Sequence, residues 1–165
     1  MRHCAAPGDV EAAVIHAVTS SGLGEAITER TSMIAINDPA ILAEVSAASE
    51  AYEVALMTND MEAMDALFWH SPLTVRYGTG DAQYGIDEIR EFRKARAGGS
   101  PQRKVIRRSV TTFGSHFAVT NIEFIREDSP SVGRQSQSWT KFPEGWRVVS
   151  AHVSLQKAAH SPLRA

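Results

Sequence analysis

The 165-residue chain has a single cysteine, Cys4, and therefore cannot form an internal disulfide or a thiolate metal site. It has no run of 18 apolar residues, so no helical membrane span is predicted. Its 17 lysines and arginines are balanced by 19 aspartates and glutamates, which is atypical of a nucleic-acid binder. Asp9 and Glu11 interrupt any apolar segment that would suit a signal peptide. These absences predict a cytoplasmic protein that binds neither nucleic acid nor membranes.

Several familiar catalytic motifs are also missing. The sequence has no H-E-x-x-H pair, no P-loop, no G-x-S-x-G and no complete G-x-G-x-x-G. Its six histidines show no close ligand spacing. A metal enzyme, a nucleotide hydrolase or a serine hydrolase of the common kinds is therefore not expected, and no metal or cofactor is predicted.

Aromatic residues are absent from the first 51 positions, and all twelve lie at or after Tyr52. Residues 1–32 are rich in Ala, Ser, Thr and Gly and hold no aromatic anchor for a core. We therefore predict a poorly ordered N-terminal extension over 1–32, one folded domain over 33–157, and a C-terminal tail over 158–165.

The first helix is predicted to begin at Asp38-Pro39. Asp38 suits the N-cap position, and Pro39 suits the first helical position. The apolar stripe that follows contains Ile41, Val45, Ser49, Tyr52 and Leu56. Next we expect a short helix capped by Asp60, a strand over 73–77, a turn over 78–81, and a third helix that starts at Ile86 and is closed by residues 98–101.

Four β-rich runs follow, over residues 103–113, 117–126, 132–142 and 146–156. The connections between them are short, which favours antiparallel pairing. Helices followed by a long antiparallel sheet are typical of the α+β class. A twisted sheet that wraps around such helices encloses one pocket.

Two polar residues on otherwise apolar segments are candidates for that pocket. Tyr52 lies on the apolar stripe of the first helix, either as an ordinary core tyrosine or as a phenol that exchanges a proton inside a cavity. Arg76 faces opposite to Val75 and Tyr77 in its strand. If it points outward it is a solvated arginine; if it points inward it needs an anionic partner, and a ligand carboxylate fits its forked geometry.

Other polar residues are weaker candidates. Trp69 and His70 join the second helix to the strand of Arg76 and could shape a pocket mouth or a packed corner. Gln137 lies on a strand in which both faces are polar, and His152 lies on the mixed face of the last strand. The basic run 103–108 is divided by alternation, with Arg103 and Arg107 on one face and Lys104 and Arg108 on the other, so it does not form a basic stripe.

Longer blocks resemble the AtzH-like family. They include Leu67-Phe68-Trp69-His70-Ser71-Pro72 and Thr74-Val75-Arg76-Tyr77-Gly78, and also residues 52, 58–60, 84–86, 92–93, 121–124, 133–137 and 145–154. The resemblance runs from about residue 34 to 156. It implies a cone-shaped nuclear-transport-factor-2-like fold of the SnoaL type, usually a homodimer, and 1,3-dicarboxyurea deamidase activity or a role in oxalurate catabolism. The family's functional tyrosine and arginine correspond to Tyr52 and Arg76.

The resulting expectation is a hydrolase that cleaves an amide C–N bond of a small anionic carboxylated urea and releases ammonia. Arg76 would hold a substrate carboxylate, and Tyr52 would exchange a proton or stabilise an oxyanion. Trp69, His70, Gln137 and His152 are the expected substrate contacts. The alternative is a non-catalytic protein that binds ureido acids or assists an amidase partner. Isomerase or dehydratase chemistry ranks last, because the polar third strand of the sheet offers no carboxylate base.

Overall fold

The computed structural model describes residues 34–96, 98–127 and 129–156. The predicted extension 1–32 and tail 158–165 lie outside these residues. The described elements are three helices, α1 (Pro39–Thr58), α2 (Met61–Ala66) and α3 (Ile86–Ala95), and six strands, β1 (Val75–Tyr77), β2 (Ala82–Tyr84), β3 (Arg103–Phe113), β4 (Phe117–Arg126), β5 (Ser129–Phe142) and β6 (Gly145–Leu155). This arrangement confirms the predicted α+β class.

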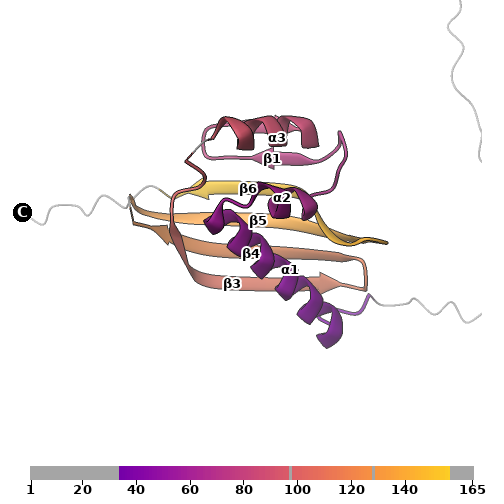
Figure 1. The fold of residues 1–165 in the computed structure, drawn as a ribbon. Helices are drawn as coiled ribbons and strands as arrows, with labels where there is room; N and C mark the ends of the chain where they lie inside the picture. The colour runs from indigo at the N-terminus through magenta and orange to yellow at the C-terminus, as the bar shows by residue number, and fades with distance from the viewer. Residues whose placement is uncertain (1–33, 97, 128, 157–165) are drawn as a thin grey trace, which may run out of the picture. The chain divides into compact units, whose positions relative to one another are not determined.

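The strands form one sheet in the order β2-β1-β6-β5-β4-β3. Strands β3 to β6 pair antiparallel with their neighbours in sequence, and β1 pairs antiparallel with β2 but parallel with β6. The sheet is therefore mainly antiparallel, as predicted. Figure 1 shows α1 and α2 crossing one face of the sheet and α3 beside β1.

The helices begin and end at the residues that suit these positions. The Asp38 carboxylate accepts hydrogen bonds from the backbone N–H groups of Ala40 (2.9 Å) and Ile41 (3.2 Å), so it caps α1. Asn59 ends α1 in the left-handed conformation, and Asp60 caps α2 through the Ala63 N–H group. None of the helices in the described part of the chain is long and apolar enough to cross a bilayer.

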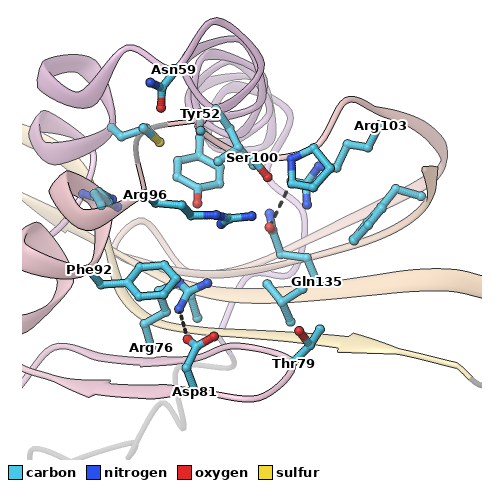
Figure 2. Close-up of a pocket in the computed structure, with 18 of the residues that line it drawn as sticks. Tyr52, Asn59, Arg76, Thr79, Asp81, Phe92, Arg96, Ser100, Arg103 and Gln135 are labelled. Atoms are coloured by element: carbon cyan, nitrogen blue, oxygen red, sulfur yellow. Dashed lines mark hydrogen bonds and ion pairs between the residues drawn. The ribbon is translucent and has the colours of Figure 1, made fainter. Parts of the chain in front are cut away.

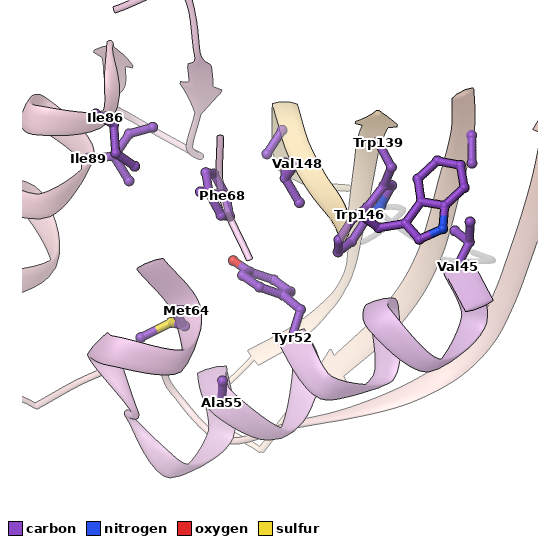
Figure 3. Packing of buried hydrophobic residues seen from close by; sticks show 12 residues of the cluster. Val45, Tyr52, Ala55, Met64, Phe68, Ile86, Ile89, Trp139, Trp146 and Val148 are labelled. Carbon is purple, nitrogen blue, oxygen red and sulfur yellow. The ribbon is translucent and has the colours of Figure 1, made fainter. Parts of the chain in front are cut away.

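A hydrophobic core fills the space between α1, α2 and the sheet (Figure 3). Trp139 and Val148 of the sheet, Val45 of α1 and Phe68 are almost completely buried. The Trp139 indole N–H group donates to the Thr120 hydroxyl at 3.0 Å, so its polar atom is satisfied. Burial of each large apolar side chain contributes about 1.5–3 kcal/mol, and this core fixes α1 and its Tyr52 against the sheet.

Several details of the strands differ from the predictions. Strand β1 begins at Val75 instead of residue 73, and β5 begins at Ser129 instead of residue 132. Strand β2 was not predicted, because its three residues become a strand only through pairing with β1 across the turn 78–81. The alternation predicted for residues 103–108 is wrong beyond Val105. A β-bulge between Val105 and Arg107 shifts the register, so Arg103 and Arg108 are partly buried while Arg107 is exposed.

Gly133 allows β5 to pass close to the ring of Phe124 on β4. A Cβ atom at this position would overlap the ring, whereas one at Gly80 would meet nothing within 4 Å. We expect Gly133→Ala to lower the free energy of unfolding by about 1–3 kcal/mol, because the core has no room for the added methyl group. Gly80→Ala is the matched control and should leave the urea midpoint unchanged. A Gly133→Ala variant as stable as the wild type would contradict this packing.

Candidate functional site

A cavity of about 390 Å³ lies between the helices and the sheet, a volume within the usual range for small-molecule sites. Its apolar wall is formed by Leu56, Met64, Phe92, Phe124, Ala151 and Val153. Its charged lining consists of five arginines and one carboxylate, namely Arg76, Arg93, Arg96, Arg103, Arg126 and Asp81. Two further carboxylates, Asp65 and Glu53, pair with lining arginines from outside the lining, so the positive excess is smaller than the lining alone suggests. The remaining positive charge favours an anionic ligand.

Tyr52 projects into the cavity from α1, and Figure 2 shows its hydroxyl beside Arg96. The residue is only 6% exposed, and its ring centroid lies 5.8 Å from that of Phe68. Within the described residues the hydroxyl makes no hydrogen bond. The ring is therefore held by packing, while the hydroxyl is available to a ligand.

Arg76 points inward from β1, and its side chain is 14% exposed. Its Nη1 donates to Asp81 Oδ1 at 2.6 Å and to the Gln83 side-chain oxygen at 2.5 Å. Its guanidinium carbon lies 4.4 Å from the centroid of the Phe92 ring. The anionic partner that an inward arginine requires is thus supplied by the protein itself, and one nitrogen of the guanidinium is engaged.

Asp81 is the one carboxylate among the lining residues, and it lies in the turn that leads into β2. Burial acts to raise the pKa of Asp81, but hydrogen bonds from Gln83 and Arg76 outweigh it and hold the pKa below its usual value. Asp81 is therefore a weak proton acceptor. Its geometry suits a positioning residue that fixes Arg76.

Arg103, which lines the cavity, forms a second ion pair with Glu53. Arg103 Nη2 donates to Glu53 Oε2 at 2.7 Å and to the Gln135 side-chain oxygen at 3.0 Å, and the Gln135 amide donates to Glu53 Oε1 at 3.0 Å. The side chains of Arg103 and Glu53 are only 4% and 10% exposed. This closed network joins α1, β3 and β5, so it holds the wall that carries Tyr52.

Arg93 and Arg96 enter the cavity from the end of α3. Arg93 is paired with Asp65 at 2.5 Å, and its guanidinium carbon lies 4.5 Å from the centroid of the Phe68 ring. Arg96 has its guanidinium carbon 5.8 Å from the centroid of the Phe92 ring and forms no ion pair within the described residues. Burial, together with the charges of Arg76 and Arg126, lowers the pKa of Arg96 from its usual value.

Of the six residues predicted for the site, the structure brings Tyr52 and Arg76 together in the cavity. The lining does not include Trp69, His70, Gln137 or His152. Their own contacts explain this placement. Trp69 stacks on Phe142 with ring centroids 5.4 Å apart, and His70 Nε2 lies 3.0 Å from the backbone oxygen of Asp65.

The remaining two residues lie on the sheet but outside the cavity lining. Gln137 is 2% exposed and accepts a hydrogen bond from the Thr120 hydroxyl at 3.4 Å. His152 is exposed and packs edge-to-face on Tyr77, because its two neighbours, Ala151 and Val153, are the β6 residues that face the cavity.

Sequence reasoning missed Asp81, Arg93, Arg96, Arg103 and Gln135. The spacing of three between Arg93 and Arg96 was one available signal, because it places both on one side of a helix. No group of three His, Cys, Asp or Glu residues in the described part of the chain lies where it could hold a metal ion.

Comparison with curated proteins gives no significant match. A protein of unknown function from Pectobacterium atrosepticum, of the DUF3225 family, is 50% identical with a TM-score of 0.71, over 73% of this chain and 94% of that one. A cystatin-like fold protein from Burkholderia xenovorans is 49% identical with a TM-score of 0.71, over 74% of this chain and 96% of that one.

More distant structures share the fold alone. A nuclear-transport-factor-2-like superfamily protein from Salmonella enterica is 22% identical with a TM-score of 0.61, over 76% of this chain and 98% of that one. Others with this fold are named for a dehydratase and a ketosteroid isomerase, so the fold is used by enzymes. The AtzH-like family matches residues 34–159, which is more than half of the chain, and the protein therefore belongs to the AtzH-like family.

Proposed function

We propose that the protein hydrolyses a C–N bond of a small carboxylated urea such as 1,3-dicarboxyurea. The observation that carries the proposal is the lining of the cavity, which contains five arginines and one carboxylate together with the hydroxyl of Tyr52, which forms no hydrogen bond with a described residue. Arg76, Arg93 and Arg103 are paired with carboxylates, and Arg96 is not. The charge excess suits a substrate with carboxylate groups. The volume of about 390 Å³ accommodates a molecule of this size.

The proposed roles follow from the contacts. Arg76 is fixed by Asp81 and Gln83 and has further donors for a substrate carboxylate, so it orients the substrate. Tyr52 donates a hydrogen bond to the oxygen that becomes negative when water adds to the carbonyl carbon. The C=O bond then re-forms, the C–N bond breaks, and the leaving nitrogen takes the proton released by the added water.

The products depend on which bond breaks. Both nitrogens of 1,3-dicarboxyurea carry a carboxylate, so hydrolysis at either end gives bicarbonate and a monocarboxylated urea. Hydrolysis at the central carbonyl gives carbamates, which decompose to ammonia and bicarbonate. Ammonia therefore appears only after the first products decompose.

The test follows freshly made 1,3-dicarboxyurea by ¹³C NMR with the purified full-length protein. The uncatalysed decomposition is followed in parallel, and oxalurate is tested as a second substrate. We expect turnover above background by the wild type and a loss of about 100-fold or more in Arg76→Ala, because the substrate is no longer oriented. Arg134→Ala is the control, since Arg134 is an exposed arginine paired with Glu123 outside the cavity.

One observation favours a second candidate, a protein that binds ureido acids without turnover. The carboxylate of the cavity is a weak base because the pKa of Asp81 is lowered. Under this alternative, carboxylated ureas raise the melting temperature of the wild type but not of Arg76→Ala, and no product forms above background. If there is neither turnover nor stabilisation, both candidates are wrong.

A further inference from the structure

Arg96 is a charged group in the cavity that the protein does not neutralise. Its guanidinium forms no hydrogen bond or ion pair with any described residue, whereas Arg76, Arg93 and Arg103 are paired with carboxylates. It is half-buried, and it lies near the like charges of Arg76 and Arg126 and near the opposite charge of Asp81, with which it forms no ion pair. A guanidinium placed in this way is costly until an anion neutralises it.

A second donor on the same wall is also unsatisfied. Arg93 lies one helical turn before Arg96 and its side chain is only 9% exposed. Its Nη1 is bound by Asp65, but its Nη2 is buried without a hydrogen-bond partner. Native proteins rarely leave such a donor unpaired, and Arg93 lines the cavity, although Nη2 itself has almost no exposed surface.

Arg93 and Arg96, at the end of α3, are distinct from the ion pair of Arg76 with Asp81. Arg76 and Arg96 both contact the Phe92 ring, with guanidinium carbons 4.4 Å and 5.8 Å from its centroid, and Figure 2 shows Arg96 between Tyr52 and Arg76. Arg76 has an internal carboxylate and Arg96 has none. The cavity thus offers two guanidinium groups in different electrostatic states.

We propose that the cavity selects small dicarboxylates and that Arg96 holds the second carboxylate, which a monocarboxylate lacks. The inference rests on the proposed function for the nature of the substrate, and it adds the requirement for two charges. A ligand with one carboxylate neutralises only one of these two guanidinium groups. A ligand with two carboxylates neutralises both.

The inference is tested by calorimetry with glutarate and butyrate at one fixed ionic strength. Glutarate has the five-atom backbone of 1,3-dicarboxyurea without a C–N bond, and butyrate is the same chain less one carboxylate. We expect the wild type to bind glutarate at least about tenfold more tightly than butyrate. Arg96→Gln should bring the ratio close to one through loss of glutarate affinity, and Arg96→Lys should restore part of it.

Arg134→Gln removes one positive charge outside the cavity and is expected to keep the preference, which separates contact from long-range attraction. Equal binding of the two ligands by the wild type, or a preference that survives Arg96→Gln, overturns the inference. If the preference depends on Arg96 but dicarboxyurea is not hydrolysed, only the proposed function is wrong. If dicarboxyurea is hydrolysed without a glutarate preference, only the dicarboxylate inference is wrong.

Discussion

Tyr52→Phe should lower the turnover of 1,3-dicarboxyurea by about 100-fold or more while changing stability by less than about 0.5 kcal/mol. The hydroxyl has no hydrogen-bond partner among the described residues, so its removal breaks no structural bond. The ring keeps its place against Phe68. Turnover falls because the donor to the developing oxyanion is lost.

The measurement is kcat by ¹³C NMR together with a urea unfolding curve for each variant. KM should change little, because the proposed donor acts mainly in the transition state. Tyr84→Phe is the control, since Tyr84 is 60% exposed on β2 and does not line the cavity. Full turnover by Tyr52→Phe would show that the Tyr52 hydroxyl has no catalytic role.

Glu53→Ala should have the largest effect on stability, with a loss of about 3 kcal/mol in the free energy of unfolding. The substitution leaves Arg103, which is 4% exposed, without its carboxylate. It also removes the acceptor of the Gln135 amide. An unpaired buried charge and an unsatisfied buried donor both destabilise the folded state.

Urea midpoints of three variants separate these effects. Glu53→Ala combined with Arg103→Met should recover most of the lost stability, because no buried charge is then left unpaired. Glu91→Ala removes a carboxylate from an exposed pair with Lys94 and should be nearly neutral. A Glu53→Ala midpoint equal to that of the wild type would mean that water reaches Arg103.

Much of the fold could be predicted because its signals are local. Asp38 and Asp60 cap helices where their side chains reach the first free N–H groups, and alternation marks β4 and β6. Strand β2 and the bulge after Val105 could not be predicted, because each depends on the neighbouring strand rather than on its own residues.

The site could be predicted only in part. Tyr52 lies on the apolar stripe of α1, whereas the alternation of its strand left the direction of Arg76 open, and the resemblance to the AtzH-like family singled out the two together. Both line the cavity. The ion pair of Arg103 with Glu53 joins residues 50 positions apart, which no local pattern reveals. His152 was assigned to the correct strand, but the cavity lies on the face of Ala151.

Asp81 competes with an incoming carboxylate for Nη1 of Arg76. An incoming carboxylate that takes Arg76 Nη1 exchanges with a carboxylate already 2.6 Å away, rather than with water. The gain at this position is only the difference between two similar partners. A carboxylate that binds through the other guanidinium nitrogens leaves the pair with Asp81 intact, whereas one that takes Nη1 gains affinity only through a further contact elsewhere in the cavity.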